Sequence, residues 1–412
     1  MPSTRSEGAN SWHRSRPEDT SFTSFTRNYR LMTRDAVRHF EAAFAKCQEA
    51  VAARAFWMGR VGLYALLRAL GVGEGDRVGI CAFTCVGVVE AVTRLRATPV
   101  FLDVDRHLSV APSALERLTA PLKVLVLQHT FGVPSQLDAA LAWATKKEVA
   151  VIEDCCHSLD ATWDNRRVGT YGLGALFAFE WGKPFSAGQG GMVTFQDAGL
   201  AREVDRIIAA DAIRPGWQEA TSLSVQRLLY RWLVTPRTRR ALRTAYRWAS
   251  RHGLISGVPP RSAQLTGEAA GFFKLCCKSQ ALAAHEQLRR WPDIRARRMS
   301  AAAVIHNRLQ TEGIQVEAPD PRASPMYLRV PIWVQSKPQL LAAAASACLD
   351  VGGWYATPAH PLQGEVLAEL GYDPVCCPYA EQAFAHVVTL PTRPALTPAQ
   401  LETAMRLIRS AR

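Results

Sequence analysis

Short apolar runs that alternate with helical segments constrain the fold of this chain more than any other feature. The runs have the length of buried strands, and the segments between them suit helices of about ten residues. This alternation is typical of a mainly parallel sheet covered by helices on both faces, so we predict a three-layer α/β/α fold. The expected strands are Arg77 to Cys81, Pro99 to Val104, Leu122 to Gln128 and Val149 to Ile152, and the expected helices include Val86 to Leu95 and Leu137 to Thr145.

Polar residues stand at the points where the expected strands end. Thr84 and His129 come just after two strands, Asp154 closes a third, and Lys183 follows another apolar run, Leu176 to Phe179. In open α/β sheets, ligands bind outside the carboxyl ends of the strands. We therefore predict that these four side chains share one functional edge of the sheet.

Asp154 and Lys183 together indicate a specific chemistry. A lysine amine can form a Schiff base with the aldehyde of pyridoxal phosphate, and a carboxylate can keep the pyridine nitrogen of this cofactor protonated. In an arbitrary α/β protein, Asp154 would be a strand-end cap and Lys183 a solvated loop residue. The apolar strands before both residues and the small-residue loop from Ser186 to Gly191 favour the catalytic interpretation.

A glycine and an arginine open an expected helix near the start of the chain. Gly59 and Arg60 begin this helix and Gly71 ends it, whereas an earlier helical pattern runs from about Asp35 to Arg54. Free backbone amides at a helix start, together with Arg60, would suit a phosphate group. The alternative is an ordinary turn with a solvated arginine.

The net charge of +13 comes largely from one segment. No acidic residue lies between Glu219 and Glu268 but nine arginines do, so the charge excess is local and does not predict nucleic-acid binding. Within an expected helical insertion at 212–262, this pattern predicts a solvated helix face. The alternative is contact of residues 223–252 with an acidic membrane surface or substrate. The residues of the two basic helices are Arg239, Arg243, Arg247 and Arg251, and Arg227, Leu228 and Trp232.

Composition gives the remaining organisation. Residues 1–30 are polar and predict a mobile tail, followed by a large domain at 31–284 and a smaller α+β domain at 285–412. No apolar run reaches the length of a membrane span, and no signal peptide opens the chain. The ten cysteines show no C-x-x-C spacing. We therefore expect reduced thiols, no metal site and a cytoplasmic protein.

Ordered segments of the chain resemble the DegT/DnrJ/StrS-type sugar aminotransferases. The resemblance runs from about residue 35 to the end. It implies the fold type I of pyridoxal-phosphate-dependent transferases, and a homodimer whose sites are built from two subunits. The segments are Gly73 to Val78, Ala82 to Thr84, Thr98 to Asp105, Gln128 to Pro134, Val151 to Asp154, the surroundings of Lys183, Tyr327 to Pro331, His360-Pro361 and Leu390 to Thr392.

The resemblance implies roles for individual residues. Lys183 is similar to the Schiff-base lysine, Asp154 to the partner of the pyridine nitrogen, and His157 to a glutamine that contacts the phenolic oxygen. The remaining cofactor contacts implied are Gly59, Arg60, Val61 and Thr84, with Cys85 in place of an aromatic residue that often stacks on the ring.

Two departures from the family concern the phosphate group. Ala178 replaces a serine that normally binds phosphate, and Leu275 replaces an asparagine or arginine that reaches the phosphate from the second subunit. A charge-assisted hydrogen bond is roughly twice as strong as a neutral one, so Arg60, assisted by Lys274, is expected to offset much of the loss.

By this resemblance, glutamate or glutamine donates an amino group to a nucleotide-linked keto-sugar, in the biosynthesis of cell-surface polysaccharides or secondary metabolites. Lysine at position 183 argues against the dehydratase branch, which has histidine there. His129 and His360 are candidate substrate contacts, and a satisfied strand-end histidine is an equal alternative for His129. Three other interpretations stay open: transamination of a ketocyclitol or another ketone, a different pyridoxal phosphate reaction, and a catalytically silent membrane-associated scaffold.

Overall fold

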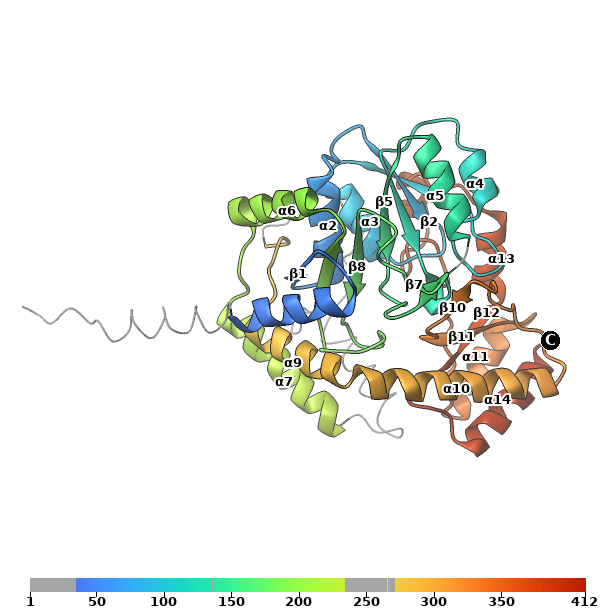
Figure 1. Ribbon diagram of the computed structural model, residues 1–412. Helices are drawn as coiled ribbons and strands as arrows, with labels where there is room; N and C mark the ends of the chain where they lie inside the picture. Colours follow the sequence, from blue (N-terminus) through green and yellow to red (C-terminus); the bar gives the residue numbers. More distant parts are fainter. Residues whose placement is uncertain (1–34, 135, 234–264, 266–270) are drawn as a thin grey trace, which may run out of the picture.

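The computed structural model of the chain describes residues 35–134, 136–233, 265 and 271–412. Its centre is a seven-stranded sheet in the order β1-β9-β8-β5-β4-β2-β3 (Figure 1). β9 runs in the opposite direction to the other six strands, so the predicted mainly parallel sheet is confirmed. The strands are β1 (Ala52–Phe56), β2 (Arg77–Cys81), β3 (Thr98–Leu102), β4 (Val124–Gln128), β5 (Ala150–Asp154), β8 (Gly174–Ala178) and β9 (Gly191–Phe195).

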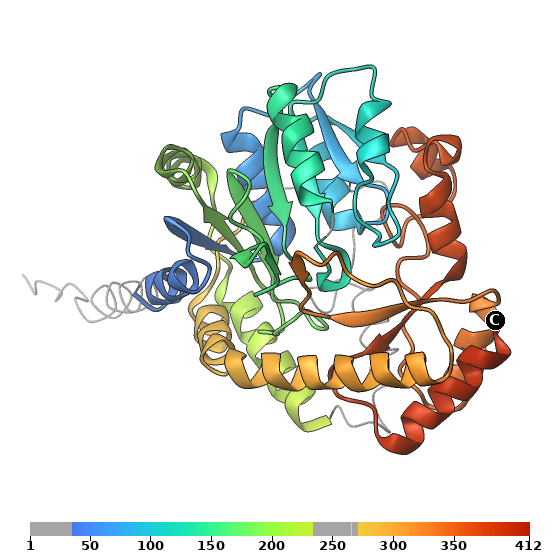
Figure 2. The same ribbon diagram turned by 45° about the vertical axis from the view of Figure 1, so that its right-hand side comes forward.

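Helices cover both faces of the sheet (Figures 1 and 2). The central strands β4, β8 and β9 are buried along their whole length, as expected for strands enclosed between two layers. On one face lie α2 (Gly59–Ala69), α3 (Val86–Thr93) and α6 (Ala198–Asp211), and on the other α4 (Pro112–Glu116), α5 (Leu137–Lys146) and the helix at 35–47.

The two faces of β8 show how this burial is reached. Leu176 packs toward α2, where the absence of a side chain at Gly62 lets the helix approach the strand. The next residue, Phe177, meets Phe44 of the helix at 35–47 with ring centroids 5.0 Å apart. Successive side chains of the strand thus fill opposite layers.

A second apolar cluster lies in the C-terminal part of the chain. There β11 (Arg329–Trp333) pairs antiparallel with β12 (Val387–Pro391), and α10 (Trp291–Thr311), α11 (Lys337–Ser346) and α14 (Pro398–Ser410) pack around them. The segment between α11 and β12 instead returns to the large sheet, where Phe384 stacks on Phe83. The predicted domain boundary at residue 285 stays a prediction.

Short elements complete the described chain. The β6–β7 hairpin pairs with β10, and α9 leads directly into α10. These elements are β6 (Thr162–Trp163), β7 (Arg166–Arg167), β10 (Ala323–Ser324), η1 (Thr130–Gly132), α7 (Trp217–Leu233), α9 (Lys278–Arg289), α12 (Glu365–Glu369), η3 (Pro374–Cys376) and α13 (Pro378–His386).

The predicted helix from Asp35 to Arg54 is wrong in its second half. The helix ends at residue 47, and Ala52–Phe56 form β1 at the edge of the sheet. Its alanines favour a helix by intrinsic propensity, but pairing with β9, far along the chain, decides the structure.

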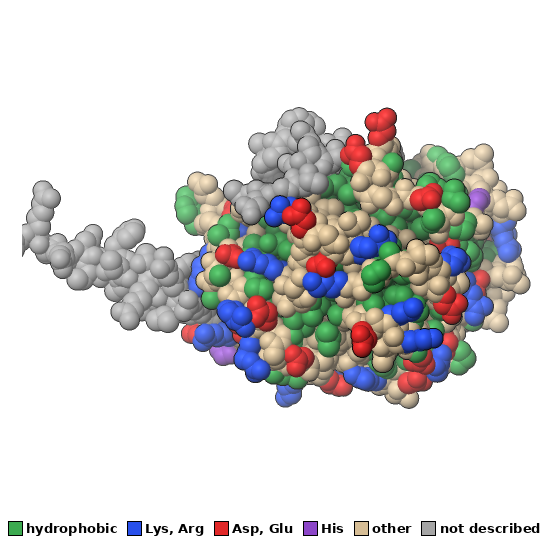
Figure 3. Space-filling model, turned by 90° about the horizontal axis from the view of Figure 1, so that it is seen from above, with side chains coloured by type: hydrophobic (Ala, Val, Ile, Leu, Met, Phe, Trp, Pro, Cys, Tyr) green, Lys and Arg blue, Asp and Glu red, His purple; other side chains and the backbone are tan. Residues whose placement is uncertain are grey.

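The basic insertion is described only in part. α7 confirms the predicted helix around Arg227 and Leu228. The tail at 1–30 and the helix containing Arg239, Arg243, Arg247 and Arg251 lie outside the described residues. On the face seen in Figure 3, basic and acidic side chains are intermixed across the described surface. Among the described helices, none is both long and apolar enough to cross a bilayer.

Candidate functional site

The carboxyl ends of β2, β4, β5 and β8 meet at one edge of the sheet, as parallel strands require. Asp154, the last residue of β5, and Cys85, after β2, both raise the pKa of Lys183, which lies in the loop after β8. The backbone N–H of His129, after β4, donates to the carbonyl of Asp154 over 3.2 Å. The edge predicted from the sequence therefore exists and brings these residues together.

Asp154 is a buried carboxylate with a defined orientation. Its side chain is 5% exposed, and Oδ1 accepts the backbone N–H of Cys156 over 3.0 Å. This local bond orients the carboxylate at the end of β5, and Asp154 is one of the groups that raise the pKa of Lys183.

Lys183 is a partly buried amine in an acidic environment. Burial lowers the pKa of Lys183, but Cys156, Cys85, Glu180 and Asp154 together raise this pKa above its ordinary value. Among the described residues, no side chain or carbonyl accepts a hydrogen bond from its Nζ. The amine is thus placed beside a carboxylate without being tied to a fixed partner.

His157 is a buried neutral imidazole with one unused donor. Its Nδ1 accepts the backbone N–H of Phe131 over 3.2 Å, and the two rings stack with centroids 5.9 Å apart. Burial, and next the charge of Lys183, hold the pKa of His157 well below its usual range. Because Nδ1 accepts, the proton of the neutral ring is assigned to Nε2, which finds no partner among the described residues.

The start of α2 lies against the ends of β8 and β9. A Cβ on Gly59 would come within 3.0 Å of the Cβ of Ala178, and a Cβ on Gly191 within 2.5 Å of the Cα of Gly59. No side chain caps this helix, and its first turn holds no acidic residue. The backbone N–H groups of Gly59, Arg60 and Val61 have no partner within the described part of the chain, which suits an anion.

The guanidinium of Arg60 belongs to a buried charge cluster. Its Nη1 lies 2.6 Å from Oε2 of Glu90, and Oε1 of the same carboxylate lies 2.8 Å from Nη2 of Arg94. Two arginines thus share the Glu90 carboxylate, and Glu180 also acts electrostatically on Arg60. Glu90 is not among the predicted site residues, although an acid inside the apolar run of α3 is a sequence signal for a buried charged partner.

Cys85 and His360 lie beside this cluster. A Cβ on Gly87 would lie 3.7 Å from both Nε of Arg60 and Sγ of Cys85. The backbone N–H of His360 donates to the carbonyl of Thr84, and the carbonyl of His360 accepts from Val86. The C-terminal segment therefore closes over the start of α3, and His360 joins the predicted edge.

Thr84 connects to a polar network inside the sheet. Its hydroxyl donates to Oε1 of Gln128 over 2.6 Å, and Nε2 of Gln128 donates to Thr130 and to the carbonyl of Phe83. The Thr84 hydroxyl is thus held by the protein itself.

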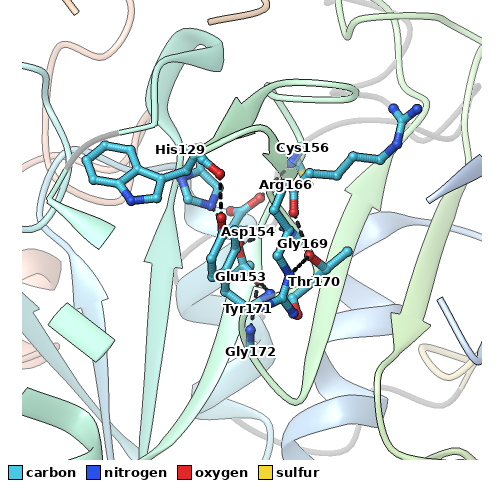
Figure 4. A network of polar contacts seen from close by, with 11 residues as sticks. His129, Glu153, Asp154, Cys156, Arg166, Gly169, Thr170, Tyr171 and Gly172 are labelled. Carbon is cyan, nitrogen blue, oxygen red and sulfur yellow. Dashed lines mark hydrogen bonds and ion pairs between the residues drawn. The ribbon is translucent and has the colours of Figure 1, made fainter. Parts of the chain in front are cut away.

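His129 has a buried partner in the strand next to it. Its Nε2 lies 3.0 Å from Oε2 of Glu153 (Figure 4). This oxygen also accepts the backbone N–H of Gly169, and Oε1 of the same carboxylate accepts those of Tyr171 and Gly172. Burial raises the pKa of Glu153, but His129 and these amides lower it below its usual value. The arrangement matches the satisfied-histidine alternative, and a substrate contact of His129 stays a prediction.

His129, Glu153 and Cys155 also form a tight group of metal-ligand types. Their ligand atoms lie within 4.8 Å of one another. Both carboxylate oxygens already accept hydrogen bonds, and burial, with Glu153 next, raises the pKa of the Cys155 thiol well above its usual value. The group is therefore explained by packing and hydrogen bonding within the protein.

Lys274 and Leu275 lie beside the edge strand β1. The carbonyl of Lys274 accepts the N–H of Trp57, and the Lys274 ammonium lies 2.5 Å from Oε1 of Glu219 in α7. Within its own chain, Lys274 is thus paired with Glu219, and a cofactor contact of Lys274 stays a prediction.

The chain was compared with known proteins. The model of the DegT/DnrJ/EryC1/StrS aminotransferase family matches residues 15–222 and 240–409. L-glutamine:2-deoxy-scyllo-inosose aminotransferase of Micromonospora echinospora is 36% identical over 174 residues, which are 42% of this chain and 41% of that protein. UDP-N-acetyl-3-dehydro-alpha-D-glucosamine 3-aminotransferase of Acidithiobacillus ferrooxidans is 38% identical over 141 residues, 34% of this chain and 38% of that protein. These alignments span about two-fifths of each relative.

Solved structures share the fold over most of the chain. The putative sugar aminotransferase Spr1654 of Streptococcus pneumoniae, in its PMP form, superposes with a TM-score of 0.71 at 16% identity and covers 91% of both chains. The aminotransferase TlmJ of Streptoalloteichus hindustanus superposes with a TM-score of 0.68 at 22% identity, covering 91% of this chain and 90% of its own. The family match extends over both the large sheet and the C-terminal cluster, and the predicted family is confirmed: this chain belongs to the DegT/DnrJ/EryC1/StrS aminotransferase family.

Proposed function

We propose that the chain is a pyridoxal-phosphate-dependent aminotransferase that moves an amino group from glutamate or glutamine to a cyclic keto substrate. The observation that carries the proposal is the meeting of buried Asp154, Lys183 and the unpartnered Nε2–H of His157 at one sheet edge. Family membership supports amino transfer as the reaction. A homodimer in the cytoplasm belongs to the proposal, because the family resemblance implies two subunits per site.

The residues present fit pyridoxal phosphate. When bound, this cofactor supplies an aldehyde that forms a Schiff base with amines and an electron-poor ring that takes up negative charge. Asp154 would hold a proton on the ring nitrogen, and Nε2–H of His157 would donate to the phenolic oxygen. The Lys183 amine would bind the aldehyde and, once released, would move the proton from the α-carbon of the amino donor.

The acceptor in the proposal is a keto-sugar or a ketocyclitol. Among the relatives, one is named for an inosose, a cyclitol ketone, and another for a UDP-linked keto-sugar. Both acceptors carry a ketone on a hydroxylated ring. The proposal therefore names this shared chemistry, with the nucleotide-linked sugar as its first candidate.

In the proposal, the phosphate group of the cofactor binds at the start of α2 and to the side chain of Arg60. Ala178 offers no hydroxyl beside Gly59, but the free amides of the first turn and the guanidinium of Arg60 belong to the start of this helix. A guanidinium carries five N–H donors, so the bond of Arg60 to Glu90 leaves donors for a phosphate.

Replacing the lysine tests the catalytic assignment. We expect Lys183→Ala to abolish covalent attachment of pyridoxal phosphate, because no amine then reaches the aldehyde. Borohydride reduction of the loaded protein, followed by peptide mass spectrometry, should find the cofactor on Lys183 in the wild type and in the control Lys147→Ala. Attachment at another lysine, or none in the wild type, would contradict the assignment.

Replacing Arg60 tests the proposed phosphate-binding site. We expect Arg60→Ala to weaken pyridoxal phosphate binding about tenfold or more, since a charge-assisted hydrogen bond contributes about 1.5–3 kcal/mol. Binding of pyridoxal, which lacks the phosphate, should not change. Arg68→Ala, at the other end of the same helix, is the control. If Arg60→Ala binds pyridoxal phosphate as tightly as the wild type, the proposed role of Arg60 in phosphate binding is wrong.

Neutral His157 predicts a pH dependence of stability. In the unfolded chain this histidine takes up a proton near pH 6.5, whereas in the folded chain its lowered pKa delays protonation. The stability should thus be fully present above about pH 6.5 and fall below it by about 1.4 kcal/mol per pH unit, until the folded-state pKa is reached. Urea unfolding of the apoprotein from pH 7.5 to 5 should show a shallower fall for His157→Gln than for the wild type. The exposed His39→Gln controls for the loss of a histidine, and equal slopes in all three proteins would refute the prediction.

A further inference from the structure

Arg298 is a buried arginine that the proposed function does not use. It lies in α10 and is 4% exposed. Its Nε donates to the carbonyl of Pro184 over 3.1 Å, and Nη2 donates to the carbonyl of Lys183 over 3.2 Å. Its Nη1 donates to the carbonyl of Leu328 over 3.2 Å and to the hydroxyl of Thr392 over 2.7 Å.

All acceptors of Arg298 are neutral oxygen atoms. Among the described residues, no carboxylate pairs with it, and burial, then Arg393 and Arg329, lower the pKa of Arg298 to about 9. A buried cation without a counter-charge is costly, so these four hydrogen bonds must compensate for lost hydration. They use four of the five guanidinium N–H groups, so Arg298 links protein segments and is not a ligand-binding side chain. These four hydrogen bonds are called the Arg298 brace below.

The brace acts on the loop that carries Lys183. Inside this loop, the N–H of Lys183 donates to the carbonyl of Glu180, and the N–H of Ala187 donates to the carbonyl of Phe179. Neither bond involves the carbonyls of Lys183 and Pro184. Within the described chain, Arg298 is the donor that holds both of these carbonyls. Two turns earlier on α10, Trp291 packs edge-on against Phe185 of the same loop, with centroids 6.1 Å apart.

The other two acceptors lie in the C-terminal cluster. Leu328 immediately precedes β11, and Thr392 immediately follows β12. The Thr392 hydroxyl also lies within hydrogen-bonding distance of the carbonyls of Tyr327 and Leu328. One planar guanidinium therefore joins the loop of the large sheet to both strands of the small sheet.

We propose that Arg298 is a positioning residue that orients Lys183 by holding the carbonyls of Lys183 and Pro184 against the C-terminal cluster. This inference rests on the proposed role of Lys183 as the cofactor lysine. Without these bonds the carbonyls of Lys183 and Pro184 lose their donor, although Phe185 still packs on Trp291, and the amine spends less time facing the cofactor aldehyde. The non-covalent binding of the cofactor, which depends on Asp154, His157 and the start of α2, is unaffected.

A double-mutant design separates orientation of the lysine from general folding. Arg298→Met removes all four bonds, and Arg298→Lys keeps the charge without the planar fork. Thr392→Val removes one acceptor of Arg298 together with the bond that the hydroxyl itself donates to the Tyr327 or Leu328 carbonyl. Arg297→Met, on the exposed face of the same helix, is the matched control. Each change is made in the full chain with Lys183 and in a Lys183→Ala background.

One rate measurement and one binding measurement test the positioning role of Arg298. The first is the rate constant for covalent attachment of added pyridoxal phosphate to apoprotein, followed by visible absorbance and borohydride trapping. The second is the dissociation constant of pyridoxal phosphate in the Lys183→Ala background. We expect Arg298→Met and Arg298→Lys to slow attachment about tenfold or more and Thr392→Val to slow it less, while all dissociation constants stay within about twofold.

The possible results are distinct. If the wild type attaches the cofactor at Lys183 but the Arg298 and Thr392 variants do so equally fast, only the positioning role is overturned. If these variants weaken cofactor binding equally in both backgrounds, Arg298 supports the structure in general and the positioning role is likewise overturned. If the wild type attaches no cofactor at Lys183, the proposed function fails and this inference falls with it.

Discussion

The site of this protein depends on the burial of a parallel sheet on both faces. Strands such as β4 and β8 are apolar throughout, so titratable groups are confined largely to the points where strands end. Asp154 and Lys183 stand at two such ends, in surroundings where charges are weakly screened. The carboxylate of Asp154 is one of four groups that together raise the pKa of the Lys183 amine, and this pairing is the basis of the proposed function.

Features encoded by local sequence patterns could be predicted from the sequence. The strand ends at Thr84, His129, Asp154 and Lys183, and the family to which they point, followed from apolar periodicity and ordered motifs. The partners of buried charges could not be predicted in this way, since Glu90 lies 30 residues from Arg60 and Arg298 lies 115 residues from Lys183. β1 was mistaken for a helix for the same reason, because its partner β9 is distant in sequence.

Arg60 and Arg298 have contrasting partners. Arg60 shares the Glu90 carboxylate with Arg94, and its bond to Glu90 uses only one of its five N–H groups, so N–H donors remain beside the free amides of α2. Arg298 donates four N–H groups to neutral oxygen atoms of the protein, so these donors are not available to a ligand. Their partners, more than their positions in the sequence, distinguish an arginine available to a ligand from one that braces a loop.

The central claim is that Asp154 and Lys183 form a pyridoxal phosphate site that exchanges amino groups with an amino acid. Its most direct test is the visible absorption spectrum of the full-length protein, recorded with pyridoxal phosphate and again after addition of L-glutamine or L-glutamate. The account predicts a protein-bound cofactor band that moves to shorter wavelength when the amino donor is added. A spectrum that stays that of free pyridoxal phosphate, and does not respond to either donor, would contradict it.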